Sequence, residues 1–251
     1  MKVFVAFSKF AVAIMCVVIL LVGATEEHRE KPDEQRQNVT GSAFPEIVSE
    51  DTVAEINAKL TSGSKVLLAH NFVGDLKIVY SSQSPRDGRM HYLAVSISDP
   101  LASNPDEIKK TFLSDTMGNL FRALFISERS FYFSVQEMYH VPVVFFRTSK
   151  AELASYVASF LLTPKILING IQHAGPFSMR PSSSGYYVIV LKGQLLLAPA
   201  SPPYDLVVLS FMESFKDAHS DDFVSKKIYL LTEEGLAVVP SSRLSSPRGS
   251  I

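Results

Sequence analysis

The chain has 251 residues, and its 24 Lys and Arg side chains balance 25 Asp and Glu, so the formal net charge is −1. This balance provides no basic stripe of the kind that binds duplex nucleic acid, and we expect no nucleic-acid partner. Hydrophobic residues make up 47% and charged residues 20%, which excludes a wholly disordered chain and fits one large domain or two small ones.

Residues 1–24 have the pattern of a secretory signal peptide. Lys2 and Lys9 precede an uncharged apolar run over 10–24, and Val22-Gly23-Ala24 supplies small or branched residues for cleavage after Ala24. The run is shorter than the roughly 20 apolar residues that span a bilayer, although an uncleaved signal anchor is the alternative. Cleavage removes Cys16, the single cysteine, so we expect a mature chain without disulfides that reaches an internal destination through the secretory route.

The polar segment 25–44 has few apolar side chains, and we expect it to be a disordered linker or a transit-like targeting segment. Five acidic residues lie in this segment, whereas plastid targeting peptides are typically basic. It contains the glycosylation sequon Asn38-Val39-Thr40. A serine-rich end predicts a disordered tail over 241–251, so the folded domain is expected over 45–240.

Hydrophobic periodicity and turn residues predict the elements of the first half. A helix is predicted over 51–61, and Asn104, Pro105 and two acidic residues predict the start of a second helix that ends near residue 124. Asp87-Gly88 predicts a hairpin turn. Branched and aromatic runs predict strands over 65–69, 76–80, 91–97, 131–135 and 141–146.

Ser149-Lys150-Ala151-Glu152 has the form of a capping box, which predicts that a helix starts there. Behind it, Leu153, Val157 and Phe160 share one helical face and are expected to form its buried stripe. Pro164 is expected to end this helix.

A similar order of elements follows in the second half, which suggests an internal duplication. A second capping box is predicted at 210–213, a hairpin turn at Lys192-Gly193, and a short helix from Thr232. Strands are predicted over 165–168, 186–191, 194–198, 206–210 and 227–231.

The sequence lacks the common motifs of catalysis and cofactor binding. No two of the six histidines stand at metal-ligand spacing, and there is no phosphate-binding loop, dinucleotide fingerprint or nucleophile elbow. The carboxylate pairs Asp221-Asp222 and Glu233-Glu234 fall at expected element ends, where a solvated helix start explains them. We therefore expect no enzyme, no cofactor and no metal, with a site assembled from distant residues as the alternative.

Aromatic side chains offer the remaining candidate contact surface, since the chain has 17 Phe and 9 Tyr. Phe131, Phe133, Met138 and Tyr139 cluster just before the strand that carries Phe145. One interpretation places all five in the core. The other makes them an open apolar surface that contacts extended peptides.

Several segments are similar to one known family. Residues 133–139 (FSVQEMY) resemble a V-S-L-x-E-V-Y segment, residues 185–190 (GYYVIV) a G-Y-L-T-I strand, and residues 227–236 (KIYLLTEEGL) a final strand with an L-E-G-L helix start. These are segments of the twenty-two-kilodalton Tic family, proteins of the plastid envelope translocon and their cyanobacterial relatives. The resemblance covers about 50–240. The family's G-V-P-V-F appears here only as Gly175-Pro176-Phe177 and as Ser64-Lys65-Val66-Leu67.

The resemblance implies an α+β fold with two pseudo-symmetric repeats of antiparallel β-strands backed by helices. It implies a non-enzymatic protein-import factor of a secondary plastid such as the apicoplast. Such a factor is soluble or a peripheral membrane protein of the envelope or intermembrane space. It binds unfolded precursor proteins in a chaperone-like manner and works with translocon subunits, with the five aromatic and Met residues above as precursor contacts. The alternative is a secreted or vacuolar interaction module with an unknown partner.

Overall fold

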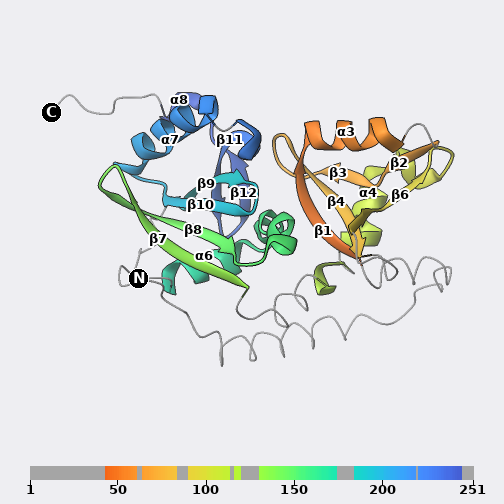
Figure 1. Cartoon of the computed structure of the whole chain (residues 1–251), viewed down its shortest axis with the longest axis horizontal. Helices are drawn as coiled ribbons and strands as arrows, with labels where there is room; N and C mark the ends of the chain where they lie inside the picture. Colours follow the sequence, from red (N-terminus) through yellow and green to blue (C-terminus); the bar gives the residue numbers. More distant parts are fainter. Residues whose placement is uncertain are drawn as a thin grey trace.

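The computed structural model describes residues 43–60, 64–83, 90–113, 116–119, 130–173, 184–218 and 220–244. They form antiparallel sheets with helices packed against them, which confirms the predicted α+β class. Figure 1 shows two lobes side by side: an N-lobe (43–119) that carries α3, and a C-lobe (130–244) whose sheet lies between α6 and α7. The predicted signal peptide, its cleavage after Ala24 and the polar segment as far as residue 42 lie outside the described residues.

In the N-lobe, β4 is the central strand of a four-stranded antiparallel sheet. β1 pairs with β4 from Ala43↔Ser82 to Ser49↔Leu76, while β3 and β5 share the other edge of β4. β2 and β6 form a separate two-stranded sheet. The elements are β1 (Ala43–Ser49), α3 (Glu50–Leu60), β2 (Lys65–Leu67), β3 (Ala69–Asn71), β4 (Leu76–Gln83), β5 (Met90–Tyr92), β6 (Ala94–Ser96), η3 (Pro100–Ser103), α4 (Pro105–Ile108) and η4 (Lys109–Leu113).

The predicted N-lobe elements are largely confirmed, with two strands divided. The segments 65–69 and 91–97 each pass from one sheet to another, and the amide of Leu68 donates to the carbonyl of Leu93 at the crossing, 2.9 Å away. The pairing of β4 with β5 confirms the hairpin, while its predicted turn at Asp87-Gly88 lies outside the described residues. The second helix starts as predicted: Asn104 Oδ1 accepts from the amide of Glu107 at 3.3 Å.

The C-lobe is built on one six-stranded sheet in the order β12-β11-β9-β10-β8-β7, antiparallel throughout. The strands predicted around 131–135, 141–146, 186–198 and 227–231 are confirmed. The elements are β7 (Phe131–Met138), β8 (Val141–Thr148), η5 (Ala151–Tyr156), η6 (Ala158–Leu162), α6 (Pro164–His173), β9 (Tyr186–Leu191), β10 (Gln194–Pro199), α7 (Tyr204–Ala218), η7 (Ser220–Asp222), β11 (Phe223–Thr232), β12 (Gly235–Val238) and α8 (Ser241–Leu244).

Two separate repeats would each form their own sheet from one half of the sequence, and the sheets here do not follow that division. The hairpin β9–β10, the helix α7 and the hairpin β11–β12 all belong to the C-lobe, whereas β4–β5 lies in the N-lobe and β7–β8 lies in the C-lobe sheet. The pseudo-symmetric repeat therefore stays a prediction.

The capping box predicted at Ser149 is wrong. The amide of Ser149 still pairs with the carbonyl of Ser130 at 2.8 Å, so this residue extends the β7–β8 ladder, and its hydroxyl donates to the same carbonyl at 3.4 Å. The chain then forms the 3-10 helices η5 and η6, with no side-chain cap at Lys150. Leu153 is only half-buried as a result, while Val157 and Phe160 are buried as expected.

The segment after Pro164 was predicted as a strand, and it is the helix α6 instead. Proline suits the first position of a helix because its fixed backbone angle is helical and its missing amide would have no partner there. The buried side chains Leu167, Ile168 and Ile171 lie on one face of this helix. Gly170 allows close packing on β7, since a Cβ there would lie 2.3 Å from the ring of Phe133.

Two further predictions in the second half are wrong. The predicted strand 206–210 and the capping box at 210–213 both lie inside α7, because Val207, Val208, Phe211 and Met212 form one buried helical face over the sheet. The helix predicted from Thr232 is a tight turn between β11 and β12, which ends at Gly235 with φ +148°.

The two faces of the C-lobe sheet carry separate apolar cores. One face packs against α7 and α8. The other shares a core with α6, η6 and the N-lobe, where Tyr80 of β4 and Tyr229 of β11 are both fully buried. The folded region extends past the predicted bounds of 45 and 240, because Ala43 in β1 and Leu244 in α8 are buried in these packed layers.

Within the described ranges, no single helix has both the length and the apolar composition to cross a membrane. The segments Leu153–Leu162 and Pro164–His173 reach that length and composition only when taken together, and they are bent by 104° at their junction.

Candidate functional site

The five residues predicted to contact precursors do not form one open surface. Phe131 and Phe133 lie on one face of the sheet, where both rings pack against Phe146 at centroid distances of 6.0 and 4.8 Å. Phe145 is buried on the opposite face, with the guanidinium of Arg147 4.4 Å from its ring centroid. Burial therefore favours the core interpretation for Phe133 and Phe145.

Met138 and Tyr139 lie at the end of the same hairpin. Met138 is half-buried and packs against the core beneath α7. Tyr139 forms the β7–β8 turn with His140, both at positive φ, and its side chain is 54% exposed. Tyr139 is thus the most accessible of the five.

The structure offers a different contact feature at the same place, the outer edge of β7. β7 pairs with β8 over its whole length, from Phe131↔Thr148 to Met138↔Val141, and no other described strand pairs with it. Its outer edge therefore presents backbone amides and carbonyls that the described strands leave unpaired. Ser134 Oγ on β7 and Arg147 Nε on β8 are buried, with no hydrogen-bond partner among the described residues.

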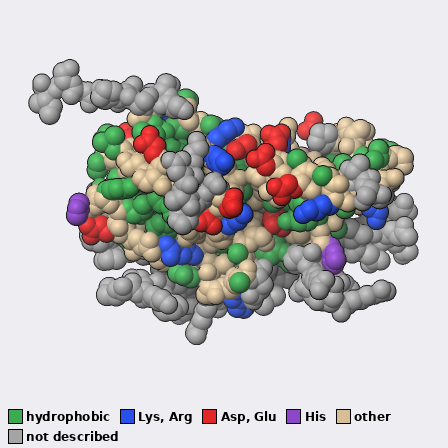
Figure 2. Space-filling view, turned by 45° about the horizontal axis from the view of Figure 1, so that its top comes forward, with side chains coloured by type: hydrophobic (Ala, Val, Ile, Leu, Met, Phe, Trp, Pro, Cys, Tyr) green, Lys and Arg blue, Asp and Glu red, His purple; other side chains and the backbone are tan. Residues whose placement is uncertain are grey.

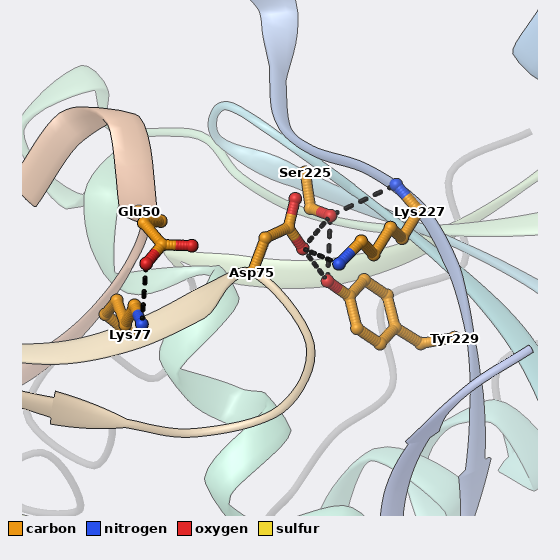
Figure 3. A network of polar contacts seen from close by, with 6 residues as sticks. All are labelled: Glu50, Asp75, Lys77, Ser225, Lys227 and Tyr229. Carbon is orange, nitrogen blue, oxygen red and sulfur yellow. Dashed lines mark hydrogen bonds and ion pairs between the residues drawn. The ribbon is translucent and has the colours of Figure 1, made fainter.

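A polar network joins the two lobes (Figure 3). Asp75 lies in the turn between β3 and β4, and its Oδ1 accepts from the hydroxyls of Tyr229 at 2.5 Å and Ser225 at 2.7 Å, both on β11. These hydroxyls are 2.8 Å apart, and Lys227 Nζ lies 4.0 Å from the same carboxylate oxygen. Burial raises the pKa of the Tyr229 hydroxyl, and the Asp75 carboxylate raises it further.

The turn that carries Asp75 fits tightly against the C-lobe. Gly74 has φ +65°, and a Cβ there would lie 2.8 Å from Cγ2 of Val238 on β12. On the N-lobe side, the carbonyl of Asp75 accepts from the amide of Glu50 at 2.8 Å, and Glu50 forms an ion pair with Lys77 at 3.1 Å. Figure 2 shows acidic and basic side chains gathered along the middle of the molecule. The groups around Asp75 in Figure 3 bond to one another, so we interpret this network as a structural connection between the two lobes.

A cleft of about 390 Å³ lies over β1, between the start of α3 and the helices η5 and η6. Its wall includes Glu46, whose side chain points to the same face of β1 as Phe44 and is 6% exposed. The hydroxyl of Tyr92 on β5 donates to Glu46 Oε1 over a long distance of 3.4 Å. The lining residues are Glu46, Ile47, Val48, Ser49, Thr52, Tyr92, Ala151, Ala154, Ser155, Ala158, Leu191, Lys192, Gly193, Phe223 and Val224.

The electrostatics of Glu46 are dominated by its removal from water. Burial raises the pKa of its carboxyl group, and the nearby hydroxyls of Ser81, Tyr92 and Ser155 offset only part of that rise. Burial also raises the pKa of Tyr156, so this neighbour stays neutral. Glu46 is therefore a carboxyl group that accepts a proton more readily than an exposed glutamate does.

We expect Glu46→Gln to stabilise the protein at neutral pH and to lose that advantage on acidification. Because the folded-state pKa of Glu46 lies above its unfolded value, ionised Glu46 opposes folding at higher pH, and the cost disappears as the pH falls through the folded pKa to about 4.5. Urea unfolding of both chains across this range measures the difference. Glu213→Gln, an exposed change on α7, controls for the lost negative charge. A difference that stays constant with pH would contradict a buried charge as the cause.

A second hollow of about 380 Å³ lies between α7, α8 and the strands β11 and β12. Its wall is largely apolar, with Glu213, Lys226 and Lys227 as its charged members. Among the residues that the structure describes, no three His, Cys, Asp or Glu side chains are placed to hold a metal ion.

Sequence reasoning missed Glu46, Asp75 and the edge of β7. Glu46 interrupts an apolar stretch of β1, which is a signal for a buried carboxyl group, but 25–44 was assigned to a linker that ended just before it. The partners of Asp75 lie about 150 residues further along the chain, so no local pattern indicates them. No family model matches the chain, and no match was found among curated proteins or among solved structures. The resemblance to the twenty-two-kilodalton Tic family thus rests on the sequence segments given above.

Proposed function

We propose that this protein is a non-enzymatic import factor of a secondary plastid, which holds unfolded segments of precursor proteins in transit between the envelope membranes. The observation that supports this proposal best is the outer edge of β7, eight residues long and unpaired by any described strand. An extended segment that adds to such an edge gains main-chain hydrogen bonds whatever its sequence. A factor that serves many precursors needs this kind of contact.

The side chains around the edge are suited to an extended polypeptide. Phe131 and Phe133 anchor β7 in the core, so the strand is held firmly while its outer edge stays available. Tyr139 offers an exposed ring at the end of the hairpin. The aromatic residues thus act mainly as support, with Tyr139 as the direct contact.

The proposed location is the apicoplast envelope or intermembrane space, reached by the signal peptide, with translocon subunits as further partners and peripheral membrane association. A secreted or vacuolar interaction module with an unknown partner is the second candidate, and it would use the same edge. A reporter fused to residues 1–44 separates the two candidates, because the fusion reaches a plastid in the first case and leaves the cell in the second.

The chain from residue 25 onward should suppress the aggregation of an unfolded model protein at low and at high salt. Main-chain pairing and apolar contacts survive salt, whereas attraction between exposed charges is screened within about 10 Å at 0.1 M salt. The chain from residue 25 onward lacks Lys2 and Lys9 and has a net charge of −3, which also gives little long-range attraction. Light scattering with increasing amounts of the protein measures the effect. If the suppression of aggregation disappears at high salt, the contact is made by exposed charged side chains and the β7 edge is not the main binding surface.

Hydrogen exchange locates the contact in the same mixture. Amides of 131–138 should gain protection when the unfolded protein is present, since the outer edge then donates to a new strand. β12 is the matched control, because it is the opposite edge of the same sheet. Equal protection of β12, or none at β7, would contradict binding at the β7 edge.

A further inference from the structure

We propose that the cleft over β1 is a binding site for a small aliphatic cation, an alkylammonium or alkylguanidinium group, with the carboxylate of Glu46 as its anchor. This site goes beyond the proposed import function and lies on other elements than the β7 edge. The cleft, of about 390 Å³, falls in the size range of small-molecule pockets, about 300–1,000 Å³.

Glu46 lies at the right place and has unused capacity. Its carboxyl group is 6% exposed, yet it lines the cleft, and the described N-lobe provides no cation beside it. The hydrogen bond that it accepts from the hydroxyl of Tyr92 is long at 3.4 Å. A buried carboxylate in this setting gains most from a cation that donates several hydrogen bonds, because charge-assisted bonds are roughly twice as strong as neutral ones.

The remaining wall suits an aliphatic chain behind the cationic group. Ala151, Ala154 and Ala158 on η5 and η6 have small side chains, which leave room opposite β1, and Phe223 and Val224 add apolar surface. Such a wall covers the methylene groups of the ligand, as protein surfaces do with the stems of lysine and arginine.

The other titratable groups that face the cleft fix how binding depends on pH. Burial raises the pKa values of Tyr92 and Tyr156, so both hydroxyls stay neutral. Lys192 is the one cation among the residues that line the cleft, and it is exposed at the turn between β9 and β10. Only the ionised form of Glu46 pairs with a cation. Binding should therefore strengthen as the pH rises through the pKa of Glu46.

The probe is n-butylguanidinium, with N-butylurea as its neutral counterpart of nearly the same shape. Titration of the chain from residue 25 onward, followed by NMR shifts, should show at least about tenfold tighter binding of the guanidinium, which corresponds to about 1.4 kcal/mol. Glu46→Gln should remove this preference, and Lys192→Ala should strengthen guanidinium binding because it removes a like charge. Glu213→Gln, at the other hollow, should leave the preference unchanged.

The proposal is overturned if the guanidinium does not bind at millimolar concentration, if the urea binds equally well, or if Glu46→Gln keeps the preference. Misfolding does not obscure the result, because Glu46→Gln is near-isosteric and its urea unfolding is measured independently. The aggregation assay separates this site from the import function: Glu46→Gln should suppress aggregation as well as the unaltered protein does.

Discussion

Leu161→Ala should lower the free energy of unfolding by about 2–5 kcal/mol, and by more than Leu153→Ala does. Leu161 is fully buried in η6, within the core that both lobes share, so its truncation leaves a cavity that the surrounding side chains cannot fill. Leu153 in η5 is half-buried and loses less apolar contact when it is shortened. Urea unfolding curves of the two variants and the unaltered protein measure the ranking.

Ser149→Ala is the matched control for the helix start. Loss of a capping hydroxyl costs about 0.5–2 kcal/mol, but the hydroxyl of Ser149 makes no cap here and only a long hydrogen bond to Ser130, at 3.4 Å. We therefore expect this variant to unfold close to the unaltered protein. A cost for Leu153→Ala above that of Leu161→Ala, together with a substantial cost for Ser149→Ala, would indicate a capped α-helix with Leu153 on its buried face.

The strands were predictable where local chemistry alone determines them. Lys192-Gly193 marks the turn between β9 and β10 because Gly193 takes φ +73°, which glycine adopts without strain. The fully apolar runs on either side of it form the buried centre of the C-lobe sheet. The start of α4 was equally local, since Asn104 caps it through its own side chain.

The hydrophobic pattern of the sequence did not predict the helices whose type and position depend on tertiary packing. The run 206–210 is short and apolar, which fits a buried strand as well as a buried helix, and the packing of α7 over the sheet decides between them. The segment from Ala151 has α-helical spacing, yet it forms 3-10 helices that start two residues after Ser149, which is still held by the β7–β8 ladder. Pro164 was correctly predicted to end the preceding helix, since η6 ends at Leu162, but the start of α6 at the same proline was missed.

The candidate sites depend on contacts between distant parts of the chain. β8 pairs with β7 on one side and with β10 of the second half on the other, and this strand order makes β7 the edge of the sheet. The cleft over β1 requires η5 and η6 to pack against β1, as the hydrogen bond from Ser159 to the carbonyl of Pro45 shows at 2.8 Å. Neither arrangement has a signature within a short window of sequence.

Tyr229→Phe should cost about 1–3 kcal/mol of unfolding free energy, because it removes the buried hydroxyl that joins Asp75 of the N-lobe to Ser225 of the C-lobe. The ring itself stays in the core, so no cavity of comparable size forms. Asp75 keeps its bond from Ser225, which limits the loss. Thermal or urea unfolding at neutral pH measures the change.

Tyr229→Phe should also reduce the loss of unfolding free energy that occurs at alkaline pH. The folded-state pKa of Tyr229 lies above its unfolded value of 10.0, so its contribution is fully present below pH 10 and is lost as the pH rises towards the folded pKa. Burial also raises the pKa of Tyr187, to about 12, so part of the alkaline loss remains in the variant. Tyr139→Phe, an exposed change at the β7–β8 turn, is the control and should alter neither quantity. If Tyr229→Phe unfolds like this control at both pH values, the hydroxyl does not hold the lobes together, and the shared apolar core alone must do so.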